Sequence, residues 1–225
     1  MLGTPGLGHT GRSKLPRSVS TNQALRERSR ERILSAALEV FGEKGYEAAS
    51  ISDVTQRAGV SRGLVTYYFP SKQRLAAELL DRWLDGIAAI LELQGTADER
   101  LAGIIDGTLM AAAATLPVQR LAISLMMQPA THPIFAEVET EKSARLSLVE
   151  DAIRAIFAER GAPDPAVEEM LLRATLEGVT VKLAIYQETF PVEAIRRRLY
   201  TSYALPAPEL PLPVPSPPIT RLRAK

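Results

Sequence analysis

Residues 50–75 read SISDVTQRAGVSRGLVTYYFPSKQRL, and they predict two short helices joined by a tight turn. Ser50 is a good N-cap, and Asp53, three residues later, can complete a capping box that starts the first helix. Gly59 can adopt the left-handed conformation that ends this helix, and Ser61 can cap the next one. The pattern is therefore that of a helix-turn-helix.

The second helix of this stretch is expected to end at Pro70 and to have two distinct faces. Val65 and Phe69 are four residues apart and can pack inward. The outer face then carries Arg62, Gly63, Thr66 and Tyr67. A helix this short is marginal in water unless it packs, and a packed helix with such an outer face suits insertion into a major groove. The local pattern leaves open a second interpretation, a helical hairpin with a solvated face.

Three segments repeat the signature of a known family. Residues 59–63, GVSRG, and residues 67–75, YYFPSKQRL, are similar to the recognition-helix signature of the TetR family of bacterial one-component regulators. Upstream, residues 41–46 read FGEKGY and resemble the same family. The resemblance is specific over residues 28–80 and only architectural beyond. It departs from the family at Thr66, where an aromatic residue is frequent.

The resemblance implies roles for single residues in DNA binding. By position in the motif, Arg62, Gly63 and Thr66 face base edges. Leu64 is available for a thymine methyl group. Phosphates are held by Ser50, Ser61, Tyr67, Tyr68 and Lys72. Arginine is the natural partner of guanine O6 and N7, and a glycine lets the helix backbone come close. Tyr68 has a competing role as a buried aromatic.

Charge and composition agree with this interpretation. Residues 1–74 hold 12 Lys and Arg against 6 Asp and Glu, whereas residues 75–225 hold 15 against 20. The basic part coincides with the predicted DNA-binding stretch. Cysteine is absent, so disulfides and thiolate metal sites are excluded. No segment approaches roughly 18 uninterrupted apolar residues, so we expect a cytoplasmic protein with no membrane partner.

The whole chain is predicted to be all-α, because no stretch alternates with period two for long enough to form a strand. It divides into a disordered basic arm over residues 1–22, a three-helix DNA-binding domain over 23–70, a helical ligand-binding and dimerisation domain over 71–203, and a Pro-rich tail over 204–225, with about nine helices in all. The first helix is expected over residues 23–44. The helix that follows Ser71 is expected to reach about Leu93 and to act as a lever between the domains. Seven prolines between Leu205 and Pro218 predict an extended, unpacked tail.

The larger domain offers two candidate surfaces. The family resemblance favours dimerisation through a helical hairpin, with the interface formed by Met170, Leu171, Ala174, Gly178, Leu183, Ile195 and Leu199. A ligand pocket could be lined by Trp83, Met110, Met126, Met127 and Phe135. Both sets have a simpler alternative, which is the packed core of one chain. The expected partners are a palindromic DNA operator, a second copy of the chain and a small-molecule effector.

An enzymatic function is not favoured. Residues 59–63 also fit the G-x-S-x-G motif of hydrolases, but that motif needs a strand before Ser61 and an activating histidine. Only two histidines occur, His9 and His132, and they lie in the arm and in a distant loop. No catalytic residue, metal site or cofactor is therefore expected. The sequence predicts a transcriptional regulator, a repressor released by its ligand, and the alternative is a helical interaction module without operator specificity.

Overall fold

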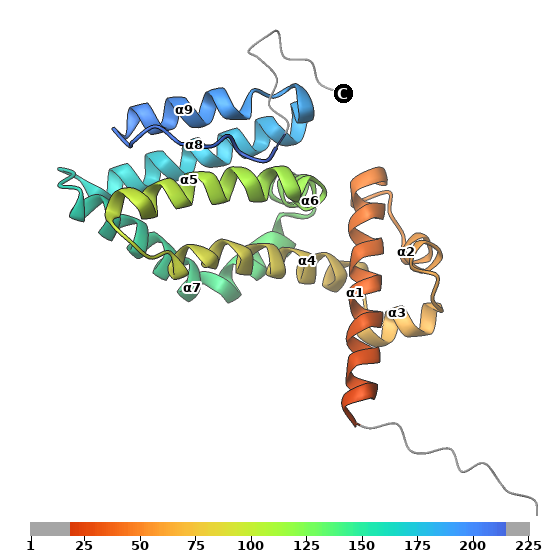
Figure 1. The fold of residues 1–225 in the computed structure, drawn as a ribbon. Coiled ribbons are helices and arrows are strands. Elements are labelled where there is room, and N and C mark those ends of the chain that lie inside the picture. The colour runs from red at the N-terminus through yellow and green to blue at the C-terminus, as the bar shows by residue number, and fades with distance from the viewer. Residues whose placement is uncertain (1–18, 215–225) are drawn as a thin grey trace, which may run out of the picture.

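The computed structural model describes residues 19–214, and this part of the chain contains helices and no strands (Figure 1). The nine α-helices of this range are α1 Val19–Lys44, α2 Ile51–Ala58, α3 Arg62–Tyr68, α4 Lys72–Ile87, α5 Ala97–Ala114, α6 Leu116–Met127, α7 His132–Glu159, α8 Pro165–Tyr186 and α9 Val192–Ser202, joined in two places by the 3₁₀ turns η1 Ala88–Glu92 and η2 Gln187–Thr189. The all-α prediction is confirmed. Most of the predicted arm, residues 1–18, lies outside the described residues, and α1 begins at Val19, earlier than expected.

The predicted caps of the helix-turn-helix are present. The Asp53 amide donates to Ser50 Oγ at 3.2 Å and the Ser50 amide donates to Asp53 Oδ2 at 2.9 Å, which completes the capping box. Gly59 ends α2 with φ of 61°, in the left-handed region. Ser61 Oγ accepts a hydrogen bond from the Leu64 amide at 3.2 Å and so starts α3. Local side-chain chemistry therefore sets both helix boundaries and the turn between them.

The helices form a small unit and a larger one (Figure 1). In the small unit α2 and α3 pack against α1, and α4 leads from α3 into the larger unit. There α4 runs beside α7 in one layer, and α5, α8 and α9 form the layers above it. The helix predicted to reach about Leu93 ends earlier, since α4 ends at Ile87 and the 3₁₀ turn η1 continues to Glu92. Its role as a lever stays a prediction.

Two hydrophobic cores hold these layers together. The first core joins buried residues of α1, α2, α3 and α4 to Leu121 and Leu125 of α6 and to Phe135 of α7. The second core fills the space between α5, α7, α8 and α9. The helix-turn-helix unit therefore has no separate core of its own, because it shares one with the start of the larger unit.

The apolar helices α5 and α6 follow one another with a sharp bend. Only Thr115 separates them, and their axes differ by 93°. Within residues 19–214 no single helix is long and apolar enough to cross a membrane, and this bent pair meets the length and composition criteria only when it is taken together.

The prediction of an unpacked tail is wrong for residues 205–214. Leu205 and Leu212 are buried in the second core. Arg196, itself buried, donates to both carboxylate oxygens of Asp106 at 2.7 and 2.5 Å and to the Leu210 carbonyl oxygen at 2.7 Å. This pairing with the carboxylate raises the pKa of Arg196 above its usual value. The proline-rich segment is thus held on α9 by a buried guanidinium and two leucines.

The two leucines at the end of this segment provide a matched test of its packing. Leu212 is 8% exposed and Leu210 is 76% exposed. We expect Leu212→Ala to lower the free energy of unfolding by about 2 kcal/mol, because apolar contact is lost and a cavity is left. Leu210→Ala should change it by less than about 0.5 kcal/mol. Chemical denaturation measures both, and equal effects would show that the segment does not pack in solution.

Candidate nucleic-acid interface

Helix α3 is fixed by one face and exposes the other. Val65 is fully buried and Phe69, directly after the helix, is 3% exposed. The opposite face carries the residues predicted to point outward, Arg62, Gly63, Thr66 and Tyr67, all of which are exposed. Leu64 and Tyr68 are half-buried and pack partly against the first core. The structure therefore separates an exposed face of four residues from two flanking side chains that also serve packing.

Gly63 is a residue that the fold of this chain does not require. A Cβ built at this position would have no neighbour closer than Ser61 Oγ at 4.0 Å. A glycine inside a helix costs about 0.5 to 1 kcal/mol relative to alanine. The position therefore has room for a side chain and carries none, which leaves the backbone of α3 open to an external partner.

Tyr67 and Tyr68 form an edge-to-face pair at the end of α3. Their ring centroids are 5.0 Å apart and the rings are inclined by 79°. Tyr68 also lies against Phe69, with ring centroids 6.4 Å apart. Tyr67 is 70% exposed, so its hydroxyl is presented to solvent from a ring that its neighbour supports.

Some hydroxyl groups of the exposed residues already donate hydrogen bonds within the chain. Ser50 Oγ donates to Asp53 Oδ2 at 2.7 Å, so its proton is used inside the capping box. Thr66 Oγ1 lies 3.1 Å from the Arg62 carbonyl oxygen and donates back to its own helix. Ser61 Oγ only accepts from the chain, and its proton remains available. Of the two serines predicted to hold phosphates, the geometry favours Ser61.

Lys72 was predicted to hold a phosphate, but its side chain is used within the fold. Its ammonium donates to the carbonyl oxygens of Tyr46, Glu47 and Ala49, at 2.9, 3.2 and 3.1 Å. It also lies 4.4 Å from the centre of the Tyr46 ring. An ammonium group has three donors. All three are used to hold the turn between α1 and α2 against the start of α4, and none is left for a phosphate.

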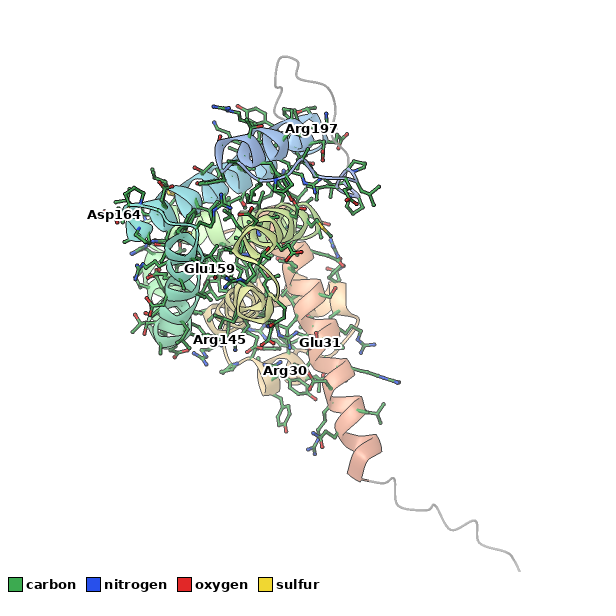
Figure 2. All side chains as sticks on the ribbon, turned by 60° about the vertical axis from the view of Figure 1, so that its left-hand side comes forward. Arg30, Glu31, Arg145, Glu159, Asp164 and Arg197 are labelled. Carbon is green, nitrogen blue, oxygen red and sulfur yellow. The ribbon has the colours of Figure 1, made fainter. Side chains whose placement is uncertain are left out.

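Several basic residues in the N-terminal third of the chain form ion pairs with acidic residues of the same chain. Arg30 and Glu31 of α1 extend toward α4 (Figure 2), where they pair with Glu78 at 2.5 Å and with Arg82 at 2.6 Å. Arg57 pairs with Glu39 and Glu43 of α1, and this pairing lowers the pKa of Glu43.

Lys44 pairs with Asp53, and with Ser50 this contact lowers the pKa of Asp53 to about 2. Apart from Lys72, whose ammonium is held by carbonyl oxygens, the cations without an ion pair in residues 19–74 are Arg26, Arg28, Arg32 and Arg62. These four arginines carry the uncompensated positive charge of the small unit.

The predicted ligand-pocket residues do not converge on one cavity. Trp83 and Phe135 pack in the first core. Met110 and Met126 are exposed on α5 and α6, and Met127 is 76% exposed at the end of α6. Of the five, Met127 alone lines the open groove of about 440 Å³ between α6 and α8. The prediction rested on residue type alone, and the positions of these methionine and aromatic residues along their helices place them on different faces.

The predicted dimer residues divide between a surface and a core. Met170, Leu171, Ala174 and Gly178 are exposed on α8, where Val167 and Ile185 extend the same apolar stripe. Leu183 and Leu199 are buried in the second core, and Ile195 packs against it. These three residues face their own chain, because the inner sides of α8 and α9 cover α5. The exposed apolar stripe is therefore confined to α8.

Comparison with known proteins identifies a family that the helix-turn-helix segment resembles. Residues 33–79 match the family model described as bacterial regulatory proteins of the tetR family. This segment of the chain is similar to the TetR family. The matched region spans the C-terminal part of α1 from residue 33 and the whole of α2 and α3, together with the first half of α4, so it lies in the unit that carries the exposed face.

Curated relatives of this chain are named as transcriptional regulators. The regulator BetI of Escherichia coli strain UMN026 is 35% identical over 86 residues, which are 35% of this chain and 43% of the relative. The activator FasR of Mycolicibacterium smegmatis is 36% identical over 81 residues, which are 35% of this chain and 37% of FasR. The chain thus spans less than half the length of these relatives. BetI of Escherichia coli strain K12 matches over 164 residues, 66% of this chain and 83% of BetI, at 26% identity.

Solved structures extend the likeness to the larger unit. A transcriptional regulator from Rhodococcus sp. Rha1 has a TM-score of 0.58 at 27% identity, covering 69% of this chain and 83% of that one. The fatty acid degradation regulator FadR from Bacillus halodurans has a TM-score of 0.65 at 19% identity, covering 78% and 94%. These likenesses confirm the fold. The matched proteins are regulators rather than enzymes, which confirms the prediction against an enzyme.

The role of Lys72 predicts a change of stability. Removal of its ammonium leaves three carbonyl oxygens without their donor, so Lys72→Ala should lower the free energy of unfolding by about 1 to 3 kcal/mol. Arg74→Ala is the control, since Arg74 is exposed and makes one ion pair, with Glu137 at 3.6 Å. It should cost less than about 1 kcal/mol. Thermal denaturation measures both, and a Lys72→Ala variant as stable as the parent would contradict the structural role.

Proposed function

We propose that this chain is a sequence-specific DNA-binding regulator of transcription that binds a palindromic operator as a homodimer and releases it when a small molecule binds. The observation that carries the proposal is the exposed face of α3, formed by Arg62, Gly63, Thr66 and Tyr67 on a helix whose other face is buried. The family match over residues 33–79 supports it.

The exposed face of α3 suits reading base edges in a major groove. Arg62 has no ion pair within the described part of the chain, so its guanidinium is free to donate to O6 and N7 of a guanine. Gly63, one residue on, lets the helix axis approach the bases closely. Thr66 lies one helical turn after Arg62 and presents a methyl group, which suits contact with a thymine. Leu64 is half-buried and contributes less than its motif position suggests.

Phosphate contacts come from the margins of the same surface. Ser61 has a free hydroxyl proton at the start of α3, and Tyr67 presents its hydroxyl at the end. Arg26, Arg28 and Arg32 add unpaired positive charge at exposed positions in the N-terminal half of α1. Such contacts position a protein on DNA without reading its sequence. The surface therefore combines a short reading segment with a wider electrostatic one.

A second copy of the chain is the partner proposed for the apolar stripe of α8. Met170 and Leu171 are 60% and 54% exposed there, and Ala174 and Gly178 allow another helix to approach closely. A two-fold interface places the same stripe on both partners. The two α3 helices would then meet half-sites about 34 to 36 Å apart on one face of the DNA.

Selection of bound sequences from random DNA tests this function directly. The full chain is expected to select an inverted repeat whose half-sites are centred about one helical turn apart, because each α3 reads one half-site. Arg62→Ala should weaken binding by about 1 to 3 kcal/mol and relax the preference at one base pair in each half-site. Competition binding with point variants of the selected operator measures both effects.

The matched control for Arg62→Ala is Arg197→Ala, since Arg197 is exposed on α9, in the larger unit (Figure 2). Arg197→Ala should leave the selected sequence unchanged. Failure to select any sequence would favour the interaction-module alternative. Identical base preferences in the parent and Arg62→Ala would remove Arg62 from the reading role. A reporter gene controlled by the selected operator then decides the direction of regulation, and a repressor requires expression to rise when the chain is deleted.

A further inference from the structure

The groove between α6 and α8 has one polar wall. It is an open groove of about 440 Å³, and its lining includes Arg120 and Ser124 of α6 and Gln128, the residue directly after the helix. Arg120 and Ser124 are four residues apart on one side of the helix, and Gln128 follows at its C-terminal end, so the three polar groups form a row. A guanidinium, a hydroxyl and an amide are all hydrogen-bond donors. The row is therefore suited to an anionic or strongly hydrogen-bond-accepting group.

The rest of the lining is apolar. α8 contributes Val181, Ala184 and Ile185, and Ile123 and Met127 of α6 complete the surface. Met127 is 76% exposed and has a flexible side chain that can adapt to a ligand. A groove with a few donors and an otherwise apolar wall is the usual composition of a small-molecule site, and its volume lies in the usual range of about 300 to 1,000 Å³.

Arg120 is held across this groove with donors to spare. Its Nε donates to the Ala184 carbonyl oxygen at 3.0 Å, which ties the guanidinium of α6 to the backbone of α8. Within residues 19–214 it makes no ion pair. A guanidinium carries five donors. The two Nη groups thus present a fixed positive charge with no carboxylate to neutralise it.

We propose that the α6–α8 groove binds a small amphipathic carboxylate. The carboxylate accepts from the Nη groups of Arg120, and the alkyl body lies along Met127 and Val181. A bidentate guanidinium–carboxylate pair supplies both charge and direction. The site rests on the proposed function in one respect, since its ligand would be the effector that releases DNA.

The position of α6 connects the groove to the DNA-binding unit. At its start, Pro117 Cβ lies 3.5 Å from the place where a Cβ of Gly42 in α1 would stand. Leu121 and Leu125, on the inner side of α6, are part of the core that also buries Val65 of α3. A ligand that prefers one separation of α6 and α8 therefore acts on a helix in direct contact with the unit that carries α3.

Calorimetric titration of the full chain with sodium octanoate, below its micelle concentration, tests the site. We expect one octanoate per chain and weaker binding of 1-octanol, which has the same chain length without the charge. Arg120→Gln keeps a donor and removes the charge, and it should weaken octanoate binding about tenfold or more. Arg198→Gln, at an exposed arginine of α9, is the matched control and should leave the affinity unchanged.

A second variant tests the apolar wall independently. Met127→Glu places a negative charge in the groove at an exposed position, so it should abolish octanoate binding while the chain stays folded. Two results overturn the proposal. One is equal octanoate affinity in the parent and in Arg120→Gln. The other is an absence of octanoate binding by the parent chain; a change from dimer to monomer in Met127→Glu by sedimentation would then show that a second copy fills the groove instead.

The proposed ligand site and the proposed function can be refuted by separate experiments. Octanoate binding is measured without DNA, and operator binding is measured without octanoate. A chain that binds octanoate but selects no DNA sequence would refute the regulator and leave the site standing. A chain that selects an operator but fails the octanoate titration would refute the site alone.

Discussion

The burial of Val65 and Phe69 is the interaction on which the proposed function depends. Helix α3 has seven residues, and an isolated helix of this length is not stable in water. Caps at Ser50 and Ser61 define where the helices begin, but a cap contributes only about 1 kcal/mol. What holds α3 in place is the first core, in which Val65 is fully buried and Phe69 nearly so. The exposed face can present Arg62 and Gly63 only because the opposite face is anchored.

That anchor belongs to both units of the molecule. The first core contains side chains from α1 to α4 and also Leu121, Leu125 and Phe135 from the larger unit. Ion pairs between α1 and α4 lie at its edge, but exposed pairs contribute little to stability. A tightly packed core transmits a shift of one helix to its neighbours. Rearrangement of α4 or α6 would therefore change where α3 is held, and α6 offers a second route of coupling beside the lever predicted from the sequence.

The sequence predicted those features whose partners are close along the chain. The capping box of Ser50 and Asp53 and the left-handed Gly59 follow from local chemistry, and all are present. Lys72 could not be assigned in this way, because the carbonyl groups that it binds lie 23 to 26 residues earlier. The tail was missed for a similar reason, since Leu212 is buried against helices that precede it and the Leu210 carbonyl is bound by Arg196.

On α8 the sequence was ambiguous in a different way. This helix is apolar on more than one face, so its pattern does not show which face is covered by α5 and which is left to solvent. The structure assigns Leu183 to the covered face and Met170 to the exposed one. The ligand groove was missed because its polar row on α6 and its apolar wall on α8 are brought together only by tertiary packing.

Amide hydrogen exchange in the full chain, with and without the selected operator, tests the central claim most directly. The account predicts that exchange slows in residues 61–68, where the exposed face of α3 meets the bases. It also predicts that exchange in residues 165–176 of α8 is unchanged by DNA, because this stripe is assigned to a partner chain. A stable complex in which residues 61–68 exchange at the rates of the free protein would contradict the account, since DNA would then be bound by another surface.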